Sequence, residues 1–178
     1  MKTILVPTDG SIAAEKALDL ALDLAEKHNA CIKLFHVLLR DKEPNELLRL
    51  PELAEANTGI VDELKNLEQS PKATLTAEQL MGERNAPRRP SPESLLRNIG
   101  AHILQRAGEH VEARGIKADV LDLADGGTAP AIKAAAEATN ADTIVMGTRG
   151  LRQIEAVTFG SVSQEVCQSS GCTCVAVH

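Results

Sequence analysis

The order of segments in the first 40 residues constrains the fold more than any other feature of the sequence. Lys2 to Pro7 is a short apolar segment that predicts a buried strand, and Thr8 to Ser11 predicts a turn. From Ile12 to His28 the small and aliphatic residues recur on one helical face, which predicts an amphipathic helix. Residues 31–39 are rich in the residue types that strands favour. A strand, a helix and a strand in this order indicate a β-α-β unit with parallel strands and a right-handed crossover.

The same alternation returns in the second half of the chain. The predicted elements are a helix over about 95–115 that ends near Gly115, a strand at Ala118–Leu123, a helix from Thr128, expected as its cap, to about Thr139, a strand at Thr143–Met146, a helix at about Ser161–Gln168 and a strand at Cys172–Val177. Strands and helices in this alternation predict an open, doubly wound α/β fold, whose five-stranded parallel sheet carries helices on both faces. Ligands of such folds bind at the carboxyl ends of the strands.

The segment over residues 41–93 has a different character. It holds six of the eight prolines and has eleven acidic against seven basic residues, so most of the net charge of -6 lies there. We interpret residues 1–178 as one domain with an insertion at about 41–93, which follows the second strand. The insertion is expected to contain one or two short helices and a mobile end, which is extended over Pro87–Pro92. This end is either a linker or a polyproline helix that a partner domain binds.

The overall charge and the N-terminus narrow the classes of function. A net charge of -6 provides no general basic field, which disfavours bulk binding of nucleic acid. The apolar run before Pro7 is too short for a signal peptide or a membrane span, so we expect a cytoplasmic protein without a membrane partner.

The four cysteines are expected to be reduced thiols, because the sequence shows no export signal that would take the chain to an oxidising compartment. Cys172 and Cys174 stand two residues apart, and the strand repeat predicts that they share one face. A metal site there would need further ligands that the sequence does not suggest, so we interpret both as buried thiols.

A glycine-containing loop follows the fourth predicted strand. Gly147, Gly150 and Gly160 are separated by two and nine residues, and Ser161 begins the next helix. Glycines let the backbone approach a ligand, and a helix N-terminus offers free N–H groups to an anion, so this pattern suits a di- or triphosphate. Arg149 and Arg152 could add charge-assisted hydrogen bonds. The phosphate loops of P-loop ATPases and of dinucleotide-binding folds are both missing from the sequence.

Other interpretations of these residues stay open at this point. The glycines could be ordinary turn and cap residues. Asp9 follows a parallel strand and could be a phospho-acceptor, although the neighbouring acidic pair that would hold Mg²⁺ is missing. His36 is more simply a strand residue satisfied locally than a catalytic base, because no nucleophile is paired with it.

These segments resemble the universal stress protein family. The resemblance rests on I-L-V-P-T-D-G-S at residues 4–11, on F-H-V at 35–37 and above all on V-M-G-T-R-G-x9-G-S-V-S at 145–163. The spacing G-x2-G-x9-G-S/T is typical of the family's ATP-binding branch, and this chain fills every position. Thr148 departs from the more common serine but keeps a hydroxyl, and the proline usual after the first cysteine of the tail is missing.

The resemblance implies a nucleotide site and a strand order of 3-2-1-4-5. Pro7, Thr8 and Asp9 would border the adenosine, and the backbone of Val37 would hydrogen-bond the adenine edge. The remaining implied contacts are Met146 and Gly147 along the adenine and ribose, and Thr148, Arg149, Gly150, Arg152, Gly160, Ser161, Val162 and Ser163 around the phosphates. The bound ligand would be ATP, ADP or AMP, with Mg²⁺ or Mn²⁺ held through the phosphates.

The resemblance also implies an assembly and a role. The strand at Cys172–Val177 would pair with its copy in a homodimer, which would cover an apolar edge that is otherwise a liability. The predicted function is a nucleotide-responsive stress or signalling protein without catalytic residues. The alternatives are a nucleotide-free dimeric scaffold that binds a client protein through the 41–93 insertion, and a slow ATP hydrolase.

Overall fold

The computed structural model describes residues 1–40, 47, 92–150 and 160–178. In chain order the elements are β1 (Thr3–Pro7), α1 (Ile12–His28), β2 (Cys31–Phe35), α6 (Pro92–Ala113), β3 (Ala118–Val120), α7 (Thr128–Ala138), β4 (Thr143–Gly147), α8 (Ser161–Ser169) and β5 (Thr173–Val177). The strands form one parallel sheet in the order β3-β2-β1-β4-β5, which confirms the predicted fold class. The predictions for the insertion lie outside the described residues, except at its end.

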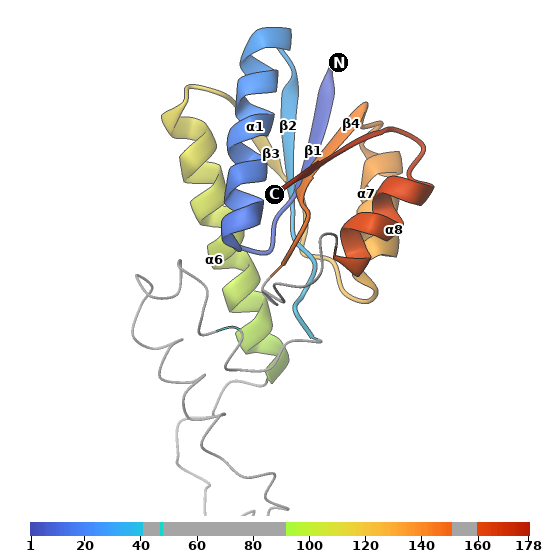
Figure 1. Cartoon of the computed structure of the whole chain (residues 1–178). Helices are drawn as coiled ribbons and strands as arrows, with labels where there is room; N and C mark the ends of the chain where they lie inside the picture. The colour runs from blue at the N-terminus through green and yellow to red at the C-terminus, as the bar shows by residue number, and fades with distance from the viewer. Residues whose placement is uncertain (41–46, 48–91, 151–159) are drawn as a thin grey trace, which may run out of the picture.

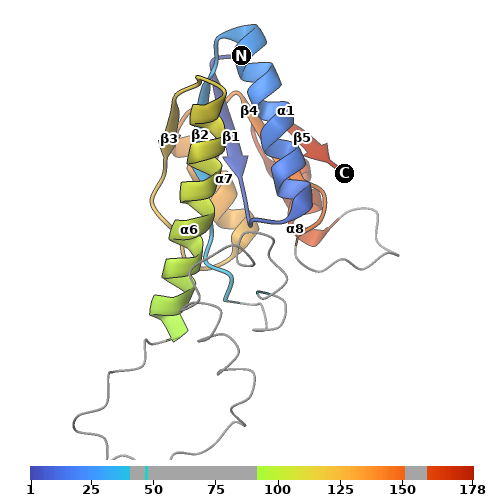
Figure 2. The same ribbon diagram turned by 90° about the vertical axis from the view of Figure 1, so that its left-hand side faces the viewer.

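Two helices cover each face of the sheet (Figure 1). Helices α1 and α6 pack with one set of strand side chains, which includes Ile4 and Val6, and α7 and α8 pack with the opposite set, which includes Leu5. Figure 2 shows α1 and α6 in front of the sheet, with α7 behind it and with β3 and β5 at the two edges. Successive residues of a strand point to opposite faces, so the apolar run of β1 supplies both layers of the core.

The core is aliphatic, because the chain has two phenylalanines and no tryptophan or tyrosine. Ile144 and Val145 of β4 are completely buried on opposite faces of the sheet. Burying a branched aliphatic side chain contributes roughly 1.5–3 kcal/mol relative to leaving it exposed. The central strands therefore hold the carboxyl ends of β1 and β4, where a ligand is expected, in fixed positions.

The ends of several elements differ from the prediction. Strand β2 ends at Phe35 and β3 at Val120, both earlier than predicted, and beyond these ends the two backbones are joined by an isolated bridge between Val37 and Ala124. Helix α6 begins at Pro92, which was expected to be extended; proline fits the first turn of a helix because the N–H that it lacks has no helical partner there. Gly115, at a φ of 70°, follows α6 as expected.

The expectation of four reduced thiols is wrong for two of the cysteines, and Cys174 is not the buried thiol that was predicted. Cys167 and Cys174 form a disulfide, whereas Cys31 and Cys172 are free. Helix α8 ends at Ser169 and the chain turns back directly into β5, so the last turn of the helix lies beside the strand. This contact brings the two Cα atoms to 5.3 Å, and it cannot be inferred from a spacing of seven residues.

Candidate functional site

A cavity of about 370 Å³ lies at the carboxyl ends of β1, β2 and β4. Its wall gathers every predicted site residue that the structure describes; Arg152 lies outside the described residues. The lining residues are Pro7, Thr8, Asp9, Ala14, Phe35, Val37, Leu39, Thr128, Ile132, Met146, Gly147, Thr148, Arg149, Gly150, Gly160, Ser161, Val162 and Ser163. Parallel strands bring the segments that follow them to one edge of the sheet, which places residues from both halves of the chain around one space.

The turn between β1 and α1 forms one wall of the cavity. Gly10 has a φ of 74°, which favours glycine, and its N–H donates a hydrogen bond to the Thr8 hydroxyl at a distance of 3.2 Å. The N–H of Ser11 donates to Oδ1 of Asp9 at 3.1 Å, and the Ser11 hydroxyl caps α1 by accepting from the N–H of Ala14. These local bonds fix the Asp9 carboxylate at the cavity.

The loop after β4 is held through Thr148, whose side chain is buried. Its N–H donates to the carbonyl of Val177 at 2.7 Å, and its carbonyl accepts from the N–H of Gly160 at 2.7 Å and from the hydroxyl of Ser163 at 3.0 Å. Its hydroxyl lies 3.0 Å from Nδ1 of His178. Residues from α8 and from the C-terminal end of β5 therefore position the same loop residue.

The three glycines of the loop are needed for close packing within the protein. None of them has a positive φ. A Cβ atom on Gly147 would lie 2.9 Å from the backbone carbon of Ala13, one on Gly150 would lie 2.6 Å from Oδ2 of Asp9, and one on Gly160 would lie 2.9 Å from the carbonyl oxygen of Thr148. The three glycines thus stand at the places where the loop and the start of α8 pack too closely against neighbouring atoms to leave room for a side chain.

One end of the cavity offers hydrogen-bond donors. Helix α8 begins after its N-cap Gly160, which provides no side-chain cap, so among the described residues the N–H groups of the first turn are available to a ligand. Among the residues that the structure describes, Nε of Arg149 is buried and has no hydrogen-bond partner. A buried donor without a partner costs about 1–3 kcal/mol, which an anion bound beside it would offset. The dipole of α8 also favours negative charge at this end.

The rest of the wall is largely apolar, and sequence reasoning missed part of it. Phe35 and Leu39 were not predicted, although they share the strand face of Val37 by the two-residue repeat, which is a signal that could have found them. Ala14, Thr128 and Ile132 line the cavity from α1 and α7, and their positions depend on how these helices cross the sheet. Thr128 is the first residue of α7 and Gly127 is its N-cap, so the predicted capping role of Thr128 is wrong.

His36 lies outside the wall of the cavity. It is 1% exposed, its Nδ1 is 2.8 Å from the Thr8 carbonyl, and Gly100 of α6 packs against its ring. Burial lowers the pKa of His36, while the bond to Thr8 and the nearby Asp9 carboxylate oppose that shift in part. The expectation of a locally satisfied strand residue is met in part, because Nδ1 has its bond, whereas Nε2 is buried with no partner among the described residues and His36 follows the end of β2.

In the part of the chain that the structure describes, no group of three or more His, Cys, Asp or Glu side chains could hold a metal ion. No helix among these residues is long and apolar enough to cross a membrane.

Comparison with known proteins shows the family. The model of the universal stress protein family matches residues 1–178, so this chain belongs to that family. Universal stress protein YxiE of Bacillus subtilis (strain 168) is 26% identical over 179 residues, covering 98% of this chain and 97% of the relative. The solved structure of universal stress protein UspA from Lactobacillus plantarum superposes with a TM-score of 0.63 at 19% identity, covering 99% of this chain and 97% of that one.

Two other similar structures contain adenine nucleotides. One is a universal stress protein in complex with cAMP, at a TM-score of 0.59 and 19% identity, which covers 99% of this chain and 97% of that one. The other is the universal stress protein from Archaeoglobus fulgidus in complex with dAMP, at a TM-score of 0.58 and 16% identity, which covers 100% of this chain and 98% of that one. At these identities the likeness shows the shared fold.

Proposed function

We propose that this universal stress protein binds an adenine nucleotide in the cavity at the carboxyl ends of β1, β2 and β4. The observation that carries the proposal is that one cavity has an apolar part and a part with hydrogen-bond donors for an anion. The loop that lines the second part has the spacing G-x2-G-x9-G-S/T. A volume of about 370 Å³ is within the range of small-molecule sites. The cAMP and dAMP complexes of similarly folded proteins support an adenine base as the ligand group.

In the proposed arrangement the base lies against the apolar wall and the phosphates face α8. Pro7 and Met146 would contact the adenine and ribose, and the backbone of Val37 would bond the base edge. The phosphates would accept hydrogen bonds from the first turn of α8 at Ser161 and Val162 and from the guanidinium of Arg149. Mg²⁺ or Mn²⁺ would be held mainly by phosphate oxygens, because Asp9 is the single carboxylate among the described lining residues.

The proposed role is to hold a nucleotide and report its presence, with slow hydrolysis at most. Fast phosphoryl transfer needs an oriented water, a base and a charge clamp around the transferring group. The Asp9 carboxylate could serve as a base, but one of its oxygens already accepts the N–H of Ser11. We therefore propose a nucleotide-responsive stress or signalling protein.

Nucleotide binding is tested on the purified full chain. We expect denaturation of the protein to release AMP, ADP or ATP, which mass spectrometry identifies. Calorimetric titration of the nucleotide-free protein with ATP and Mg²⁺ should give one site per chain. GTP should bind more weakly, because its base edge carries a different donor and acceptor pattern. A protein that carries no nucleotide and gives no heat with ATP, ADP or AMP would reject the proposal and favour the nucleotide-free scaffold.

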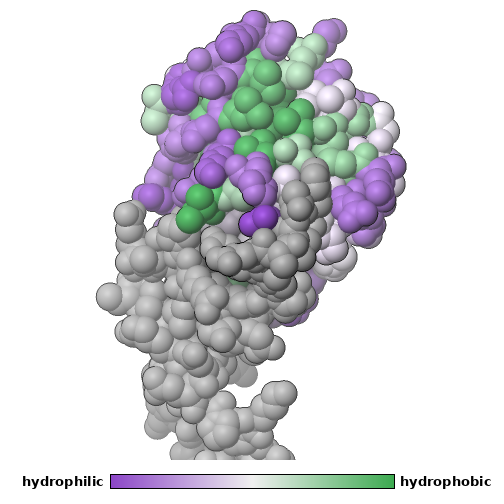
Figure 3. Space-filling model, viewed as in Figure 1, coloured by the Kyte–Doolittle hydropathy of each residue, from purple (hydrophilic) through white to green (hydrophobic). Residues whose placement is uncertain are grey.

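The same fold suggests a homodimer through β5. This strand is at the edge of the sheet, pairs with β4, and carries the half-buried Val175 and Val177. Figure 3 shows an apolar patch in the middle of the face that β5 crosses, with hydrophilic residues around it. Pairing with β5 of a second copy would satisfy its free backbone groups and cover this patch.

The backbone pattern of β5 indicates a selective test of the dimer. The N–H of Thr173 and the carbonyl of Val177 both bond toward the β4 side, so by alternation the N–H of Ala176 faces the free edge. Ala176→Pro should remove that donor and give a monomer in light scattering, while Ala176→Thr, which keeps the N–H, should stay dimeric. A dimeric Ala176→Pro protein, or a monomeric wild type at about 50 μM, would exclude this interface.

A further inference from the structure

The disulfide joins the two elements that flank the phosphate end of the proposed site. Cys167 is in the last turn of α8 and is exposed, and Cys174 is the second residue of β5 and half-buried. The Cα separation of 5.3 Å allows the bridge without movement of the backbone. Because solvent reaches Cys167, a small thiol can approach the bond from outside the protein.

The other ends of the same two elements meet at Thr148. Its carbonyl is bonded by Gly160 and Ser163 of the α8 segment, and its N–H is bonded by Val177 of β5. The hydroxyl of Thr148 contacts His178, immediately after β5. Helix α8, the disulfide, β5 and Thr148 therefore form a closed ring, in which the disulfide is the covalent link between the helix and the strand.

Without the disulfide, weaker contacts hold the C-terminal half of α8. Val166 is completely buried in the core, and Lys133 of α7 bonds to Glu165 and Ser169 of α8 at 3.4 and 3.1 Å. Both members of the Lys133–Glu165 pair are partly exposed, and such pairs contribute little. Cutting the disulfide should thus leave α8 docked but freer to tilt, which would move the N–H groups at Gly160–Ser163.

We propose that Cys167 and Cys174 form an exchange site for small thiols and disulfides, and that their oxidation state sets the nucleotide affinity of the cavity through α8. In reduction, a thiolate attacks Sγ of Cys167, the bond between the two sulfurs breaks, and Cys174 leaves as a thiolate that takes a proton from water. A second thiolate then attacks the mixed disulfide and releases Cys167. Two small thiols become one small disulfide while the protein gains two thiols, and the reverse reaction restores the bridge.

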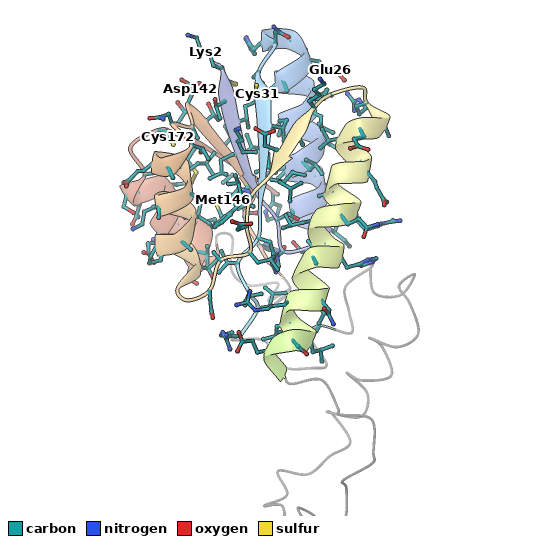
Figure 4. The ribbon with its side chains drawn as sticks, turned by 180° about the vertical axis from the view of Figure 1, so that it is seen from behind. Lys2, Glu26, Cys31, Asp142, Met146 and Cys172 are labelled. Carbon is teal, nitrogen blue, oxygen red and sulfur yellow. A yellow bond between two sulfur atoms is a disulfide. The ribbon has the colours of Figure 1, made fainter. Side chains whose placement is uncertain are left out.

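The two free cysteines are poorer partners for this chemistry. Cys172 is half-buried beside Asp142, where the amino-terminal ends of the strands lie, as Figure 4 shows. Burial raises the pKa of the Cys172 thiol; a hydrogen bond with Ser170 opposes this in part and the Asp142 charge adds to it, so little of the thiol is thiolate at neutral pH. Cys31 is exposed, but it begins β2, which β1 and β4 separate from β5, so it is too far from Cys167 and Cys174 to bond with either.

The exchange chemistry is tested without any nucleotide. The full chain is equilibrated in reduced or oxidised glutathione, alkylated, and mapped by mass spectrometry. We expect the oxidised sample to contain a linked peptide pair with Cys167 and Cys174, and the reduced sample to contain both as thiols. Cys172→Ser should behave like the wild type, and Cys167→Ser should lose the link. Free Cys167 and Cys174 in oxidised glutathione, or a bond that includes Cys172, would overturn the exchange site.

The coupling rests on the proposed nucleotide site and has its own readout. Calorimetric titration with ATP and Mg²⁺ should show about 5- to 10-fold weaker binding in the reduced protein. Cys167→Ser should bind like the reduced wild type in both buffers. Equal affinities of the two forms would overturn the coupling. Absence of binding in both forms would reject the proposed function and the coupling with it, whereas the peptide maps would still decide the exchange site.

Discussion

Gly160→Val should weaken the binding of ATP and Mg²⁺ by about 100-fold or more, which corresponds to about 2.7 kcal/mol. A Cβ atom at this position would lie 2.9 Å from the carbonyl oxygen of Thr148, a distance that real structures do not tolerate. The start of α8 must move away from the loop, which stretches the 2.7 Å bond between Gly160 and Thr148 and displaces the N–H groups of Ser161 and Val162. Calorimetric titration of the purified variant measures the loss.

A second glycine gives a matched control for this experiment. Gly127 is the N-cap of α7 and, like Gly160, has an extended conformation and makes no side-chain cap. A Cβ atom there would only touch the Pro130 ring at 3.4 Å. Gly127→Ala should therefore bind nucleotide like the wild type, while Gly160→Ala should already lose about 10-fold, or about 1.4 kcal/mol. If Gly160→Val binds with unchanged affinity, this loop does not hold the phosphates.

Gly147→Val should destabilise the fold itself by about 2–3 kcal/mol. An added Cβ would lie 2.9 Å from the backbone carbon of Ala13 and 3.0 Å from its side chain. Because the nearest atom belongs to the backbone in the first turn of α1, no rotamer change can relieve the contact, and the helix must shift away from β4. We expect a decrease in melting temperature of about 5–10 °C for a chain of this size, measured in nucleotide-free buffer.

Gly108→Ala is the control for this loss of stability. Gly108 is in α6, and a Cβ atom there would meet nothing within 4 Å in the described part of the chain. Alanine is the better helix former by about 0.5–1 kcal/mol, so this variant should melt at the same or a higher temperature. Equal melting temperatures for Gly147→Val and the wild type would show that α1 and β4 do not pack as tightly here as the structure indicates.

The sequence was sufficient to predict the architecture, because each element leaves a local signature. The small and aliphatic face of Ile12–His28 has a helical repeat, and the apolar run before Pro7 has the length of a buried strand. Strands separated by helices must be parallel, and the resemblance to universal stress proteins supplied their order. The errors were at element ends, such as Thr128 and Pro92, where one residue can serve either as a cap or as the first residue of a helix.

The candidate site was predictable to the extent that its residues follow strands. Thr8, Val37 and Gly147 each lie at or just after the end of a strand, and parallel strands bring such segments together. Ile132 was not predictable in this way, since its place in the cavity wall depends on how α7 lies across the sheet. The closed ring of α8, the disulfide, β5 and Thr148 could not be predicted from the sequence either, because its bonds join residues that are far apart in local structure.

The amino-acid sequence by itself determined the alternation of elements, the parallel sheet and the three glycines, since these depend on local periodicity and on chain connectivity. Only the tertiary structure decided what each glycine touches, which helix residues complete the cavity, and that Cys167 bonds to Cys174. The physical reason is that contact distances depend on how whole helices dock on the sheet. A shift of 1 Å in docking, far below what a sequence pattern encodes, separates a close contact from an open space.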